Sequence, residues 1–309
     1  MRLRTWMSVA SMAAVAMLVI GLGAPAGSAN GGPTPTLPTT TTTIPGTTTT
    51  STSTTTTTTT TPVPTHNPDN PFTDRALATY LKNRSGLVTA AIYDVDTGAT
   101  YTYHNGYHDR TASIVKIDIL ADLLYESQAR DKPLTAKQES LTRSMIEASN
   151  DAAATKLWAQ IGGTEEIDEF NTLIGFKYTV PSWSWGDIST TPLDQLQLLK
   201  VIALPNRILD TASRDYEMDL MEDVIGGQRF GLGWGSPAKA TVGLKDGWYK
   251  EIPTGWQVNS TGFVQYQGRF YLATIMTASD PGETYGMNTV TTIANGIWKY
   301  LMPRVVASS

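Results

Sequence analysis

Apolar and polar positions alternate near both ends of the folded part of the chain and follow a helical repeat between them. Five segments alternate and predict strands: Leu87–Asp94, Thr100–His104, Thr241–Lys245, Trp256–Tyr266 and Phe270–Thr277. Helical patterns cover Asp74–Arg84, much of 113–225 and Thr284–Leu301. Strands at both ends around a helical middle predict a two-lobed α+β protein. Its sheet would be built from both termini, with a cleft at the seam between the lobes.

One helical segment carries candidate chemistry. Apolar residues lie almost all the way round the helix predicted for Thr111–Tyr125, so this helix should be buried. Its first turn holds Ser113 and Lys116, an S-I-V-K tetrad whose serine and lysine share one face. A buried lysine is costly unless something uses it, and a serine beside a desolvated lysine is a nucleophile that needs no histidine.

A tetrad this short is expected about once by chance in a chain of this length, so its context matters. The chain contains a second copy, Ser236-Pro-Ala-Lys239, which has a proline inside it and glycines before it. No helix would align those two side chains. Only the first copy has the helical context that the chemistry requires.

The first 70 residues predict targeting and spacing segments. Arg2 and Arg4 precede an apolar stretch and a small-residue site at 27–29, which predicts a signal peptide over residues 1–29. That stretch is short for a membrane span of about 20 residues, so an uncleaved anchor is the minority alternative. Residues 30–70 are rich in threonine and proline and predict a disordered stalk, glycosylated or bare, that reaches roughly 100 Å. The folded domain is expected over 71–309.

Composition narrows the function classes. The chain has no cysteine, so neither a disulfide framework nor a lipid on an N-terminal cysteine is expected. Without Arg2 and Arg4 the 23 basic residues become 21, against 28 acidic residues, which gives a net charge of −7. That balance argues against a nucleic-acid or anionic-lipid partner. His104 and His108 flank an Asn-Gly turn and are expected in loops, so we expect no metal and no cofactor.

Three motifs follow one another along the chain. They are Ser113-Ile-Val-Lys116, then Ala148-Ser149-Asn150-Asp151, then Lys245-Asp246-Gly247 on a predicted strand edge. The series resembles the S-x-x-K, S-D-N, K-T-G series of class A β-lactamases and penicillin-binding proteins. The resemblance extends to Trp185-Gly186, Asp194-Gln195, Gln228-Arg229-Phe230-Gly231 and Asn259-Ser260-Thr261-Gly262. It implies a β-lactamase/transpeptidase-like fold, with an antiparallel sheet flanked by helices, a mainly helical lobe and an active site in the cleft between.

The resemblance implies a role for each motif. Ser113 would form an acyl-enzyme, and Lys116 would take its proton, helped by desolvation and by the nearby cation of Lys245. Asn150 would orient Lys116 and bind a substrate amide. An oxyanion hole is implied at the backbone N–H groups of Ser113 and Trp248. Lys245, Asp246, Gly247 and Trp248 form the expected substrate-binding set.

The second motif can be aligned in two ways. With Asn150 matched to the family's asparagine, Ala148 stands where the relaying serine should be, and Ser149 would substitute for it. Shifted by one residue, Asp151 replaces the asparagine. We favour the first register, which makes Ser149 and Asn150 the expected catalytic partners of Lys116.

Two further departures affect turnover. Asp246 replaces the family's threonine or serine, and an ionised aspartate there would repel the carboxylate that penicillins and D-alanyl peptides carry. The loop over 171–190, which should hold a water-activating glutamate, has only Asp187 as an acid. We therefore expect a secreted serine hydrolase, extracytoplasmic and wall-associated, that acts on a β-lactam, cell-wall peptide or ester and deacylates slowly. The alternative is a catalytically weak, wall-associated ligand-binding domain on a stalk.

Overall fold

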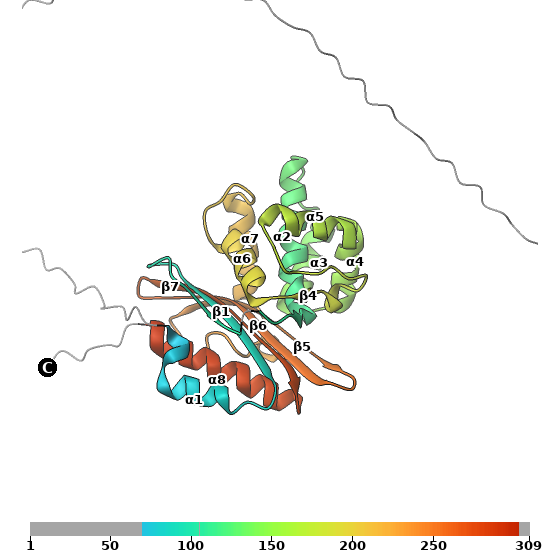
Figure 1. Ribbon diagram of the computed structural model, residues 1–309. Helices are drawn as coiled ribbons and strands as arrows, with labels where there is room; N and C mark the ends of the chain where they lie inside the picture. Colours follow the sequence, from blue (N-terminus) through green and yellow to red (C-terminus); the bar gives the residue numbers. More distant parts are fainter. Residues whose placement is uncertain (1–69, 105, 303–309) are drawn as a thin grey trace, which may run out of the picture. The chain divides into compact units, whose positions relative to one another are not determined.

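The computed structural model describes residues 70–104 and 106–302 (Figure 1). The segments predicted as signal peptide and stalk lie outside these residues, apart from Asn70, so both stay predictions. Five strands form one antiparallel sheet in the order β2-β1-β7-β6-β5. They are β1 (Leu87–Asp94), β2 (Thr100–Tyr103), β5 (Thr241–Glu251), β6 (Gly255–Tyr266) and β7 (Arg269–Asp280). The sheet thus joins strands from both ends of the sequence, as predicted.

Helices cover both faces of this sheet. α1 (Arg75–Lys82) and α8 (Glu283–Leu301) pack on one face (Figure 1). The helical lobe on the other face consists of α2 (Val115–Ala129), α3 (Ala136–Glu147), α4 (Asp151–Ile161), α5 (Thr164–Ile174), α6 (Pro192–Ala203) and α7 (Thr211–Glu222). The shorter elements are η1 (Pro71–Thr73), η2 (Ala112–Ile114), η3 (Trp185–Asp187), η4 (Gly226–Gln228) and a small ladder of β3 (Asp109–Arg110) with β4 (Ser189–Thr190). The predicted α+β class with two lobes is confirmed.

The apolar helix of the sequence pattern lies at the centre of the helical lobe (Figure 1). α2 is buried along nearly its whole length, including Lys116 and the acids Asp118 and Asp122. The predicted helix start differs, because η2 precedes α2 and Ala112 adopts a left-handed φ of 46°. Ser113 therefore sits in a 3₁₀ turn at the head of the helix. Among the described helices, none has the length and apolar character needed to cross a membrane.

The C-terminal strands follow from local sequence signals. Gln267 and Gly268 both have positive φ, 49° and 78°, which suits a two-residue hairpin turn between β6 and β7. The strand predicted for Thr241–Lys245 is longer than expected, since β5 continues through the third motif to Glu251. β5 is also an edge strand of the sheet, so one side of its backbone is open toward η2 and the helical lobe.

Candidate active site

Lys116 points back from the first turn of α2 onto Ser113. Its Nζ lies 2.9 Å from Ser113 Oγ, and its side chain is 0% exposed. Burial lowers the pKa of Lys116, and the neighbouring Asp151 opposes that shift. The structure thus brings the two residues of the first motif into direct contact in a desolvated setting. The second S-x-x-K copy lies in a loop, where Ser236 Oγ donates to the carbonyl of Gly233 instead.

Ser149 connects the first motif to the third. Its Oγ lies 3.0 Å from Lys116 Nζ and 2.9 Å from Lys245 Nζ, so one hydroxyl bridges two buried amines. Its backbone carbonyl accepts a further hydrogen bond of 2.6 Å from Lys116. Ser149 has a left-handed φ of 53°, which is uncommon for serine and aims both oxygens at the lysines. This geometry suits transfer of a proton between the lysines and a group bound beside Ser113.

The register that we favoured for the second motif is wrong. Asn150 does not orient Lys116: its Oδ1 accepts from Ala153 N at 2.9 Å and caps the start of α4. Asp151, the next residue, places Oδ1 2.6 Å from Lys116 Nζ. The physical reason is the N-cap, since the Asn150 side chain turns back onto the first turn of its own helix α4 and its Oδ1 is used there. The motif therefore reads Ser149-Asn150-Asp151, with an aspartate at the lysine.

The third motif reaches the site through β5. Lys245 and Gly247 face η2, because alternate residues of a strand share a face. A Cβ on Gly247 would lie 2.6 Å from Ser113 N, so glycine is what allows the strand backbone to touch η2. Trp248 follows, partly buried, with its ring 5.5 Å from that of Phe230. Burial and the charge of Lys116 both lower the pKa of Lys245.

Asp246 does not belong to the substrate-binding set that the sequence predicted. It lies on the opposite face of β5 from Lys245 and is 0% exposed. Its Oδ2 accepts from Phe230 N at 2.6 Å, and burial raises the pKa of its carboxyl. The predicted repulsion between Asp246 and a substrate carboxylate therefore lacks its structural basis.

The loop before β4 places an aromatic ring over the lysine. The ring centroid of Trp185 lies 5.0 Å from Lys116 Nζ, within the range of a cation–π contact. Its Nε1 donates to Thr155 Oγ1 at 3.3 Å, and its carbonyl accepts from Thr111 Oγ1 at 3.3 Å, which fixes the loop on both sides. Asp187, the only acid of this loop, is exposed. Within the contacts described for Lys116, the loop thus contributes a tryptophan and no carboxylate.

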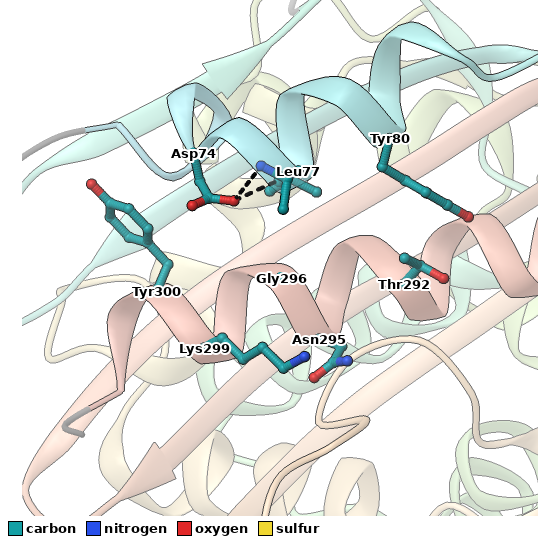
Figure 2. Close-up of a pocket in the computed structure, with 9 residues that line it drawn as sticks. Asp74, Leu77, Tyr80, Thr292, Asn295, Gly296, Lys299 and Tyr300 are labelled. Carbon is teal, nitrogen blue, oxygen red and sulfur yellow. Dashed lines mark hydrogen bonds between the residues drawn. The ribbon is translucent and has the colours of Figure 1, made fainter. Parts of the chain in front are cut away.

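A separate pocket of about 410 Å³ lies between α1 and α8, on the other face of the sheet (Figure 2). Its lining includes Leu77, Tyr80, Asn295 and Lys299 and none of the motif residues. The candidate chemistry is therefore at the contact of η2, α4 and β5 rather than in this groove.

Sequence reasoning missed three residues that shape the site. Asp151 was weighed only in the register that we rejected, although an asparagine before an apolar helix is a known N-cap signal. Trp185 and Asn259 were noted only as part of the resemblance. Asn259 Nδ2 donates to the carbonyls of Arg110 and Thr111, at 2.8 and 3.1 Å, and so anchors the segment that leads into Ser113. No local sequence signal marks either of these two contacts.

Solved structures share this fold. A class A beta-lactamase from Bacteroides cellulosilyticus aligns with a TM-score of 0.67 and 17% identity, over 75% of this chain and 98% of that chain. A class A beta-lactamase from Mycobacterium abscessus aligns with a TM-score of 0.61 and 19% identity, over 72% and 97% of the two chains. At these identities the likeness establishes the fold.

Relatives found by sequence align with this chain over only part of their length. A Mycobacterium tuberculosis protein named "Putative lipoprotein LppW" is 28% identical over 214 residues, which is 65% of this chain and 64% of the relative. This chain thus aligns with less than two thirds of that relative. The sequence model of the beta-lactamase enzyme family matches residues 128–301 and begins inside α2, after Ser113 and Lys116. Because that match covers more than half of the chain, the protein belongs to the beta-lactamase enzyme family.

Proposed function

We propose that the protein is a serine hydrolase that acts outside the cytoplasm and is acylated at Ser113. The observation that carries the proposal is the contact of 2.9 Å between Ser113 Oγ and the wholly buried Nζ of Lys116. Desolvation favours the neutral amine, which is the form that can accept a proton.

The hydrogen bonds around Lys116 are consistent with a base. A neutral amine has two N–H donors, which match the Ser149 carbonyl and Asp151 Oδ1, both at 2.6 Å. Its lone pair is then free to accept the Ser113 hydroxyl proton. An ammonium has three donors and no lone pair, so it satisfies more of the surrounding oxygens but cannot act as a base.

Acylation then proceeds in two balanced steps. Lys116 takes the hydroxyl proton while Ser113 Oγ bonds to the substrate carbonyl carbon, whose π electrons move onto its oxygen. That oxyanion would bind to the backbone N–H groups of Ser113 and Trp248, which the contact at Gly247 brings close together. When the carbonyl reforms, the bond to the leaving group breaks. The leaving group takes a proton from Ser149 Oγ, which is reprotonated by Lys116.

Deacylation is expected to be slow. The loop over 171–190 contributes Trp185 beside Lys116 and contains no glutamate to activate a water. A β-lactam, a cell-wall peptide or an ester can each supply the acyl group. Since Asp246 faces away from Ser113, the missing water activator is the remaining argument against efficient β-lactam hydrolysis.

A binding role for the same fold is the second candidate. Trp183 is 88% exposed and Trp234 is 59% exposed, and exposed tryptophans offer ring faces on which a sugar or aromatic group can stack. This favours a wall-associated ligand-binding domain with weak catalysis. The buried Ser113–Lys116 contact favours the enzyme.

Covalent labelling separates the two functions. The purified protein is incubated with a fluorescent penicillin and with a serine-reactive phosphonate, and adducts are located by mass spectrometry. We expect label on Ser113, lost in Ser113→Ala and slowed at least about 100-fold in Lys116→Ala. Ser236→Ala is the matched control, since it removes the serine of the second S-x-x-K copy and should label normally. Folded protein that takes up neither probe would favour the binding domain.

Location outside the cytoplasm is also a proposal. It rests on the signal-like residues 1–29, on the threonine-rich residues 30–70 and on the relative that is named as a lipoprotein. N-terminal sequencing of protein recovered from the outside of the host cell tests it. A start near Asn30 supports the signal peptide, whereas intact Met1 in the cytosolic fraction contradicts it.

A further inference from the structure

Asp151 makes an unusual contact with the proposed base. It is the first residue of α4 and follows the capping Asn150, so its side chain projects from the helix N-terminus toward α2. Its Oδ1 lies 2.6 Å from Lys116 Nζ. The Asp151 side chain is 73% exposed whereas the Lys116 side chain is wholly buried, so the ion pair has one partner in solvent and the other in the interior. An asparagine there could accept the same hydrogen bond but would carry no charge.

The groups that face Lys116 Nζ come from four elements. η2 contributes Ser113 Oγ, and the turn that precedes α4 contributes Ser149 Oγ and the Ser149 carbonyl. η3 contributes the Trp185 ring. The charged neighbours are Asp151 on α4 and, across Ser149 Oγ, Lys245 on β5. Burial and Lys245 both favour a neutral Lys116, whereas the Asp151 carboxylate and the Trp185 ring favour the ammonium.

Asp151 therefore opposes the protonation state that Ser113 needs. We propose that Asp151 is a positioning residue that holds Lys116 as the ammonium and thereby raises the pH at which Ser113 is acylated. This inference rests on the proposed function for its catalytic consequence. Its structural part, the effect of Asp151 on the charge of Lys116, stands independently of any substrate.

The pH profile of acylation tests the catalytic part. The rate of Ser113 labelling by the phosphonate is measured from pH 5 to 10 in the wild type, Asp151→Asn, Asp151→Ser and Asp151→Glu. Removal of the charge should move the rising limb to lower pH by about one unit, since the carboxylate is largely exposed to solvent. Asp151→Glu keeps the charge and should stay near the wild-type profile.

Glu165→Gln is the matched control. Glu165 is also an exposed acid in the first turn of a helix of this lobe, but no described contact joins it to Lys116. Removing the Glu165 charge should leave the rising limb of the pH–rate profile unchanged. The proposal is overturned if the rising limb of the pH–rate profile is unchanged in both Asp151→Asn and Asp151→Ser. It is also overturned if Glu165→Gln shifts that limb as far as the Asp151 variants do.

A direct titration of Lys116 separates failure of this inference from failure of the proposed function. Lysines are labelled with ¹³C at Cε, and the Lys116 signal is assigned by its loss in Lys116→Ala. We expect the signal to titrate at lower pH in both neutral variants. If Ser113 is never labelled but this shift is seen, the proposed role of Asp151 is supported and the proposed serine hydrolase function is rejected. If Ser113 is labelled and no shift is seen, the serine hydrolase function is supported and the proposed role of Asp151 is rejected.

Discussion

At the scale of single residues, two strained positions shape the site. Ala112 has a φ of 46° immediately before Ser113, and Ser149 has a φ of 53° between the two buried lysines. Such conformations cost of order 1–3 kcal/mol and are retained where the surroundings hold them. Between these two positions, Lys116 Nζ lies 2.9 Å from Ser113 Oγ and 3.0 Å from Ser149 Oγ. The two strained positions therefore support the hydrogen-bonded path along which the proposed mechanism moves a proton.

Ser149→Ala should break that path. We expect acylation by penicillin to fall by about 100-fold, because the leaving nitrogen loses its proton donor. A phosphonate whose leaving group needs no protonation should lose much less. Stopped-flow labelling measures the loss of acylation rate with each probe, and Ser149→Thr is the control variant that keeps the hydroxyl. Equal losses with the two probes would assign Ser149 a structural role instead.

At the scale of elements, the site depends on how closely β5 approaches η2. A Cβ on Gly247 would lie 2.6 Å from Ser113 N and 2.9 Å from Ile114 N, and both of those atoms are backbone. Neither neighbour can turn aside as a side chain would. The glycine thus sets the spacing between Ser113 and the edge strand that carries the third motif.

Gly247→Ala should push the two elements apart. We expect a loss of about 1–3 kcal/mol in the free energy of unfolding and a fall of at least about 100-fold in acylation, since both oxyanion donors shift. Gly227→Ala is the control, because a Cβ there meets nothing within 4 Å. Urea unfolding and Ser113 labelling measure the two effects. A fully active Gly247→Ala protein would contradict the placement of the oxyanion hole.

The same elements show what sequence could and could not predict. The β6–β7 hairpin follows from Gln267-Gly268, and α2 follows from its apolar pattern, because both signals are local. The partner of Lys116 in the second motif is not local. It depends on the left-handed turn at Ser149 and on Asn150 being used as a helix cap, and one residue of register changes the answer. The contact of Trp185 with Lys116 crosses between a loop and a buried helix, which no spacing rule predicts.

At the scale of the whole molecule, the helical lobe contains buried acids that form no salt bridge among the described residues. Asp118 and Asp122 on α2 and Glu217 on α7 are each at most 1% exposed. Burial raises the pKa of Asp118 to about 7 and that of Asp122 to about 8, and it also raises the pKa of Glu217 well above its usual value. These carboxyls are therefore protonated in the folded protein at mildly acidic pH.

This makes stability depend on pH with a definite sign. Each of these carboxyls has a higher pKa in the folded protein than in the unfolded chain. Its contribution to stability is therefore fully present below the unfolded pKa near 4 and is lost as the pH rises through the folded pKa of about 7 to 8. We expect the free energy of unfolding to fall by about 2 kcal/mol or more between pH 5 and 9, measured in urea. Glu217→Gln should flatten the dependence, whereas Asp215→Asn, on the exposed side of α7, should not. Because α2 carries Asp118 and Asp122 as well as Lys116, alkaline pH deprotonates the proposed base while it destabilises the helix that holds it. Unfolding free energy that stays level or rises over this range would contradict the protonated state of the cluster.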